Sequence, residues 1–152
     1  MDTINELPAH VLLVHFVVVL IPVTVVLEVA CAVWRSLRNL LWWATVLLSG
    51  GLIVLTWLTA EAGEWLQERL GGGGPAVQTH AELGDTAIWF VVALFVVSLG
   101  IAAVYLRERR AGSATALVAV VAALAIGVGI ANGVQIYRIG DSGAKAVWGE
   151  TL

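Results

Sequence analysis

The chain alternates between long apolar runs and polar intervals. Four apolar runs cover residues 11–34, 40–60, 86–106 and 114–136. A helix as long as the shortest run extends about 32 Å, which is enough to cross a hydrocarbon core of roughly 30 Å. β-branched residues are common in these runs, but an open sheet would leave unpaired backbone groups in contact with lipid. The pattern therefore predicts four transmembrane helices.

The intervals between the runs predict how the helices are arranged. Residues 35–39 and 107–113 form short connections, whereas residues 61–85 form a long one. Short connections join antiparallel neighbours in helical bundles. We therefore expect an all-α, integral membrane four-helix up-down-up-down bundle, with residues 1–152 in a single domain. The first and third helices are then diagonal to each other, as are the second and fourth. No internal repeat is evident in the sequence.

The basic residues predict the orientation of the bundle. The two short connections contain Arg35, Arg38, Arg107, Arg109 and Arg110. The opposite side contains only Arg69, Arg138 and Lys145. By the positive-inside rule both termini lie outside the cytoplasm, in an N-out/C-out topology, and tryptophans near the ends of the runs resemble the aromatic belts of both interfaces. We expect a multi-pass protein of the bacterial cytoplasmic (inner) membrane, with the lipid bilayer as its surroundings.

Composition excludes several other classes of protein. Of the 152 residues, 60% are hydrophobic and 12% are charged, against about 25% charged in a soluble domain. Eight basic and eleven acidic residues give a net charge of −3, which leaves no basic excess to bind nucleic acid. Cys31 is the single cysteine, so neither a disulfide framework nor a cysteine-based zinc cluster can form within the chain.

Polar side chains within the spans are expected to face the interior of the bundle, because they are costly toward lipid. At helical spacing, each span presents one stripe that collects most of its polar and small residues. The stripes converge near the predicted outer face on His10, Thr56, Thr59, His80, Gly84, Asn132 and Gln135. The sequence thus predicts a polar mouth at the outer end of the bundle.

The three histidines, His10, His15 and His80, are the candidate cofactor ligands. Neutral imidazole is a common ligand of haem iron, zinc and copper. Because the first and third helices are diagonal, His10 and His80 could face each other and hold haem b as two axial ligands. His15 lies about 140° around the helix from His10, so His15 and His80 form the alternative pair.

Other functions remain open at this stage. The histidines could be hydrogen-bonded groups without a cofactor, or metal ligands in a zinc or copper site completed by Glu61, Glu82 or Asp85. A haem protein of this kind would serve as an electron-transfer or redox-accessory module. The alternative is a cofactor-free accessory or scaffold subunit of a membrane complex. Transport is disfavoured because one four-helix bundle is smaller than a typical inverted-repeat transporter.

The fourth span carries a small-residue motif, Gly129-xxx-Gly133. Such spacing lets helix backbones approach closely. We expect tight packing inside the bundle, with a homodimer face or a second membrane protein as the alternative partner.

Two further features have structural interpretations. Glu28 is a single acid in the inner half of the first span. We expect it to form an ion pair with Arg35, or with Arg107 or Arg109, or to make a neutral hydrogen bond. Residues 138–148 contain two glycines around an Asp-Ser pair, a turn composition, followed by a short amphipathic segment that would cap the outer mouth.

The chain resembles the bacterial membrane family known as domain of unknown function 2231. The resemblance rests on residues 7–16 (LPAHVLLVHF), on His80 before the third span, and on residues 138–148 (RIGDSGAKAVW) after the fourth. It implies a four-helix integral membrane protein, often found in redox settings, with no established activity. Members often have proline after the phenylalanine of the first motif, where this chain has Val17.

Overall fold

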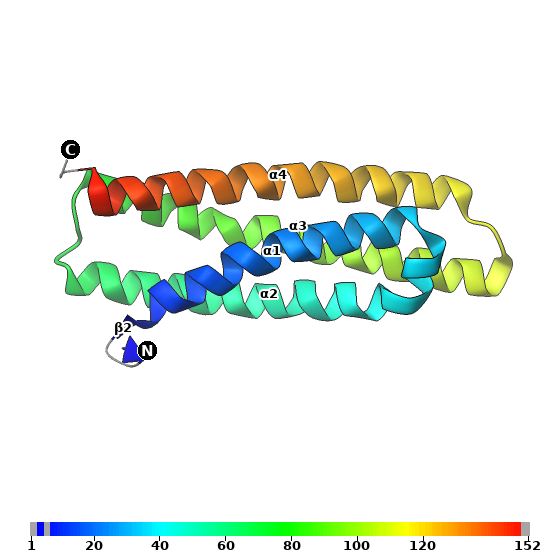
Figure 1. Cartoon of the computed structure of the whole chain (residues 1–152), viewed down its shortest axis with the longest axis horizontal. Helices are drawn as coiled ribbons and strands as arrows, with labels where there is room; N and C mark the ends of the chain where they lie inside the picture. Colours follow the sequence, from blue (N-terminus) through cyan, green and yellow to red (C-terminus); the bar gives the residue numbers. More distant parts are fainter. Residues whose placement is uncertain (1–2, 5–6, 150–152) are drawn as a thin grey trace.

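The structure, a computed structural model, describes residues 3–4 and 7–149 and consists of four long helices. They are α1 (Ala9–Val33), α2 (Arg35–Arg69), α3 (Pro75–Ala111) and α4 (Thr115–Trp148). Before α1, the two-residue strands β1 (Thr3–Ile4) and β2 (Leu7–Pro8) pair antiparallel. The helices lie side by side along one long axis (Figure 1). The all-α bundle expected from the sequence is confirmed.

Each helix packs against its neighbours in chain order, and α4 packs back against α1. The pair α1 and α3 is diagonal, as an up-down-up-down bundle requires. All four helices are long and apolar enough to cross a membrane, so the chain has the architecture of a multi-pass membrane protein. The start of α1 and the end of α4 lie at one end of the bundle with residues 70–74, and we call this the terminal end (Figure 1). The other end, with Trp34 and residues 112–114, is the arginine end. Which end faces the cytoplasm stays a prediction.

The helices extend beyond the apolar runs into the intervals between them. Helix α2 begins at Arg35, so Trp34 alone separates it from α1. At the terminal end α2 continues to Arg69 and α3 begins at Pro75, where proline suits a first helical residue. The long interval is therefore largely helical. Its turn is made by Gly71, Gly72 and Gly73, whose φ angles of 71°, 90° and 69° lie in the region that favours glycine.

The turn expected within residues 138–148 is wrong, because α4 continues through them to Trp148. Two glycines in a helix cost about 1 kcal/mol each, but tertiary contacts offset this cost. Ser142 is buried against α3, and Lys145 lies 2.7 Å from Asp141 one turn earlier. Helix α4 thereby reaches the level of His80.

The two helical hairpins are related by an internal two-fold pattern that the sequence did not reveal. The buried residues of α1 and α3 match at an offset of 70: Ile21 with Val91, Thr24 with Leu94, Glu28 with Ser98, Cys31 with Ile101. Those of α2 and α4 match at an offset of 80: Thr45 with Ala125, Ser49 with Gly129, Leu52 with Asn132, Ala62 with Ser142. The side chains differ in type, which is why no repeat was apparent, but the packing positions are shared.

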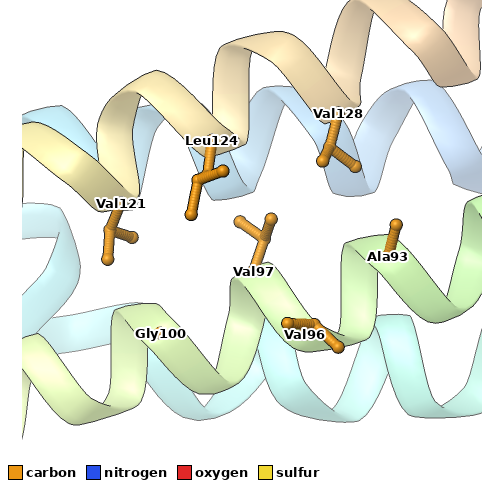
Figure 2. Close-up of a pocket in the computed structure, with 7 residues that line it drawn as sticks. All are labelled: Ala93, Val96, Val97, Gly100, Val121, Leu124 and Val128. Carbon is orange, nitrogen blue, oxygen red and sulfur yellow. The ribbon is translucent and has the colours of Figure 1, made fainter.

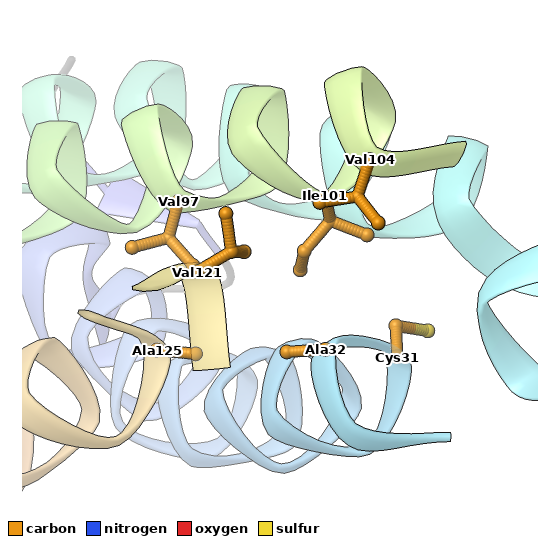
Figure 3. Packing of buried hydrophobic residues seen from close by; sticks show 7 residues of the cluster. All are labelled: Cys31, Ala32, Val97, Ile101, Val104, Val121 and Ala125. Atoms are coloured by element: carbon orange, nitrogen blue, oxygen red, sulfur yellow. The ribbon is translucent and has the colours of Figure 1, made fainter. Parts of the chain in front are cut away.

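Two apolar clusters fill the bundle below the terminal end. The cluster near the arginine end joins α1, α3 and α4 through Cys31, Ala32, Val97, Ile101, Val104, Val121 and Ala125 (Figure 3). A second cluster toward the terminal end contains Ile21, Leu52, Val91 and Leu94. Burial of such side chains holds the helices in register.

Glycines on α4 differ in what they face. A Cβ at Gly129 would lie 2.6 Å from the Val25 side chain of α1, so this glycine permits the close packing of α1 on α4. A Cβ at Gly133 would meet nothing within 4 Å, and Gly133 is exposed. Gly129 thus serves packing inside the bundle, and a partner on the side of Gly133 stays a prediction.

The ion pair at the arginine end differs from the one expected. Arg38 is 2% exposed and forms a bidentate ion pair with Glu108. The distances are 3.1 Å from Nε to Oε2 and 3.0 Å from Nη2 to Oε1. Its Nη1 donates to the carbonyls of Cys31 and Ala32, which end α1. Glu28 is fully buried, and neither of its carboxyl oxygens has a hydrogen-bond partner within the described residues. The expected pairing of Glu28 with an arginine is therefore wrong.

Candidate functional site

A cavity of about 700 Å³ lies between the four helices in the half of the bundle toward the terminal end. Its lining includes all seven residues on which the polar stripes were expected to converge: His10, Thr56, Thr59, His80, Gly84, Asn132 and Gln135. That convergence is confirmed. The remaining lining is largely apolar, as in most cofactor sites.

His10 enters the cavity from the first turn of α1 and is held against α2. Its Nδ1 lies 2.9 Å from the carbonyl oxygen of Thr59. Because a carbonyl only accepts hydrogen bonds, Nδ1 carries the proton and Nε2 keeps a free lone pair. The ring lies on Gly63, where a Cβ would come within 3.0 Å of ring atoms Cε1 and Nδ1. The glycine leaves room for the imidazole on the helix surface.

His80 is held against α4 in the same manner. Its Nδ1 lies 3.2 Å from the carbonyl oxygen of Ile139 and 3.0 Å from the hydroxyl of Ser142. The Ser142 hydroxyl also donates to the Ile139 carbonyl. A Cβ at Gly143 would lie 3.0 Å from Cε1 of the His80 ring. The proton again belongs on Nδ1, and Nε2 is left free.

The two imidazoles form a pair across the bundle. Their ring centroids are 6.3 Å apart and their planes are at 82° to each other. The residues that support them match at the same offset of 80 between α2 and α4: Thr59 corresponds to Ile139, and Gly63 corresponds to Gly143. His10 and His80 therefore occupy corresponding positions in the two hairpins.

The other sequence-predicted ligands lie apart from this pair. His15 is exposed, and its Nδ1 contacts the carbonyl oxygen of Val11 in its own helix; it lines only the edge of the cavity. Glu61 and Glu82 are exposed and lie outside the cavity lining, whereas Asp85 is exposed but lines the cavity. Within residues 3–4 and 7–149, no group of three or more His, Cys, Asp or Glu side chains could hold a metal ion.

Polar groups deeper in the cavity complete the site. Asn132 and Gln135 donate their amide hydrogens to carbonyls of α3, at Phe90 and Leu83, which fixes α4 against α3. Thr56 is 4% exposed and its hydroxyl oxygen has no partner in the described part of the chain. Hydrogen bonds therefore fix the cavity wall formed by α3 and α4, and the Thr56 hydroxyl has no hydrogen-bond partner among the described residues.

Sequence reasoning placed Thr59 in the polar mouth but did not foresee how either histidine is supported. Gly63 and Gly143 lack side chains, and the Thr59 and Ile139 contacts are made by backbone carbonyls. One signal was available in the sequence. Gly140 and Gly143 are three residues apart, a spacing that fits a helix, and Ser142 beside Gly143 lies on the buried face of α4.

A second, smaller hollow is a surface groove between α3 and α4. It is about 270 Å³ and is lined by Ala93, Val96, Val97, Gly100, Val121, Leu124 and Val128. In Figure 2, Val97 of α3 points toward α4, and the side chains that point toward α3 are those of Val121, Leu124 and Val128. It offers no polar side chain and therefore no group for ligation or catalysis.

Comparison with known proteins finds a match to one family. The family is described as "Predicted membrane protein (DUF2231)", and its model matches residues 6–152. No curated protein matches the chain. No solved structure matches it either.

Proposed function

The chain belongs to the DUF2231 family of predicted membrane proteins, and we propose that it binds one haem b between His10 and His80. The bound haem would make it an electron-transfer or redox-accessory module of the membrane. The observation that carries the proposal is that His10 and His80 line one cavity, that each is tethered through Nδ1 to a carbonyl of a neighbouring helix, and that their ring centroids are 6.3 Å apart.

The tethering supports ligation because metal-bound histidines almost always donate their other ring hydrogen to a carbonyl, carboxylate or water. That hydrogen bond selects the tautomer and limits rotation of the ring. Thr59 and Ile139 supply it to His10 and His80 from two different helices. The ligand atoms are thus oriented before a metal arrives.

The number of ligands favours haem over a bare ion. A porphyrin supplies four nitrogens, so iron needs only two axial protein ligands, whereas structural zinc usually takes four protein ligands. The described chain brings two imidazoles together without a third ligand. A volume of about 700 Å³ also lies within the range of cofactor sites, about 300–1,000 Å³.

The charge of the cavity constrains how haem could sit. The described lining includes Glu64 and Asp85 but no Lys or Arg. Anionic propionates therefore require water at the terminal end rather than a cation inside the cavity. Iron held by two imidazoles supplies one-electron chemistry, and the protein residues provide orientation and exclusion of water.

The test is an absorption spectrum of the protein purified in detergent after expression with haem available. We expect a Soret band and sharp reduced-state bands that are lost in His10→Ala and in His80→Ala. His15→Ala is the matched control from the same helix and should keep the full spectrum.

A colourless protein that does not take up added haem would overturn the proposal. So would a haem spectrum that survives replacement of both His10 and His80. Metal analysis of such a preparation would then distinguish a zinc or copper site from a cofactor-free scaffold.

A further inference from the structure

The histidine cavity is open between α1 and α4. Two stripes of α1 line it: the inward stripe of His10 and an exposed stripe of Val11, His15 and Val18. The opposite rim is made by exposed Gly140 and Val147 of α4. Exposed residues of both helices can line one cavity only where the helices part.

The course of α1 explains the opening. Near mid-bundle α1 and α4 pack closely, with Val25 against Gly129. Toward the terminal end α1 crosses away from α4 and approaches α2 (Figure 1). The gap on the α4 side is the part of the cavity that His15 borders.

The rim is apolar apart from His15. Val11 and Val18 are each 40% exposed and Val147 is 66% exposed. The α1 rim lies within the apolar run, so it faces lipid rather than water. A polar side chain on such a surface is expensive and commonly marks a functional site.

His15 has one ring nitrogen available. Its Nδ1 contacts the Val11 carbonyl one turn earlier, so Nδ1 carries the proton and Nε2 is a free base. No Lys or Arg stands among the described lining residues, so nothing at the rim attracts a phospholipid phosphate or a fatty-acid carboxylate. The matching ligand is neutral, dissolves in lipid and carries an O–H group.

We propose that this opening binds the head group of a membrane-dissolved quinol, with His15 as the base that accepts its proton. The inference rests on the proposed haem site, because the electron needs an acceptor. Nε2 of His15 would accept the proton as each quinol O–H bond breaks, and the ferric haem held by His10 and His80 would take up the electron. Two such transfers, to two ferric proteins, convert one quinol to quinone and release two protons through His15.

The experiment uses the haem-loaded protein in phospholipid nanodiscs and follows its reduction by decylubiquinol at the Soret band. General-base catalysis contributes about a hundredfold or more, so we expect His15→Gln to slow this reduction by about a hundredfold. Reduction by water-soluble dithionite should not change. Equal rates of quinol reduction in wild type and His15→Gln would overturn the role of His15.

A second pair of variants tests the opening without altering His15. Gly140→Leu places a side chain on the rim, and Gly133→Leu places the same side chain two turns earlier on α4, outside the lining. Added Cβ atoms at both positions meet nothing within 4 Å. We expect only Gly140→Leu to slow reduction by quinol. We also expect only Gly140→Leu to abolish the Soret shift that titration with oxidised decylubiquinone, which transfers no electron, produces in the ferric protein.

The two proposals fail in different ways. A protein that takes up no haem overturns the haem site before any quinol is added. If decylubiquinol does not reduce the haem-loaded protein, the haem site stands and the quinol site is overturned. The same conclusion follows if the two leucine variants are reduced equally fast.

Discussion

The histidine pair shows how much of a site depends on groups that have no side chain. His10 and His80 are oriented by carbonyls of Thr59 and Ile139 and lie on glycines of the neighbouring helices. The residue types of the ligands could be recognised in the sequence. Their tautomers could not, because they depend on which backbone oxygen another helix brings within reach.

At the residue scale, Gly143→Ala tests the support of His80. The new Cβ would lie 3.0 Å from Cε1 of the ring, so the imidazole must shift by a few tenths of an ångström. Changes to the groups that orient a ligand typically reduce metal affinity by 10–100-fold, and we expect about a tenfold loss of haem affinity by titration of apoprotein. Gly133→Ala, in open space on the same helix, should have no effect; equal affinities in both variants would contradict this role of Gly143.

At the scale of the helices, one buried ion pair joins three elements. Arg38 of α2 binds Glu108 of α3 and the last carbonyls of α1. Arg35 lies one turn earlier, 3.8 Å from Glu108, and is 62% exposed. In the sequence, both arginines count equally toward the positive-inside rule. Their difference in burial follows only from how the helices pack.

Arg38→Ala should lower the free energy of unfolding by about 3–5 kcal/mol, because it leaves Glu108 buried without its partner. The measurement is chemical unfolding in detergent followed by helical circular dichroism. Arg35→Ala is the matched control and should cost less than about 1 kcal/mol, as exposed pairs do. A similar loss in both variants would show that Arg38 is not the residue that joins the helices.

Helix ends were the least predictable elements. Glycine composition favoured a turn at residues 140–143, yet α4 continues to Trp148. Local propensity differs between these outcomes by only about 1 kcal/mol per glycine. Burial of Ser142 and its contact with His80 decide it, and these arise only once α3 and α4 are packed together.

For the whole molecule, the untested property is its orientation in the membrane. The distribution of arginines predicts that residues 70–74 lie outside and residues 112–114 inside. In a Cys31→Ala background, Gly72→Cys should react with a membrane-impermeant maleimide on intact cells, and Ser113→Cys only after permeabilisation. The reverse pattern would place the histidine cavity on the cytoplasmic side.

The sequence by itself determined the four apolar helices, their antiparallel order and the end at which the polar stripes meet. These follow from short-range periodicity and from the cost of exposing polar groups to lipid. The tertiary structure alone decided the tautomers of His10 and His80, the Arg38–Glu108 pair, the unpartnered Glu28 and the opening between α1 and α4. Each of these depends on distances between residues far apart in the chain, which helix crossing sets and periodicity does not record.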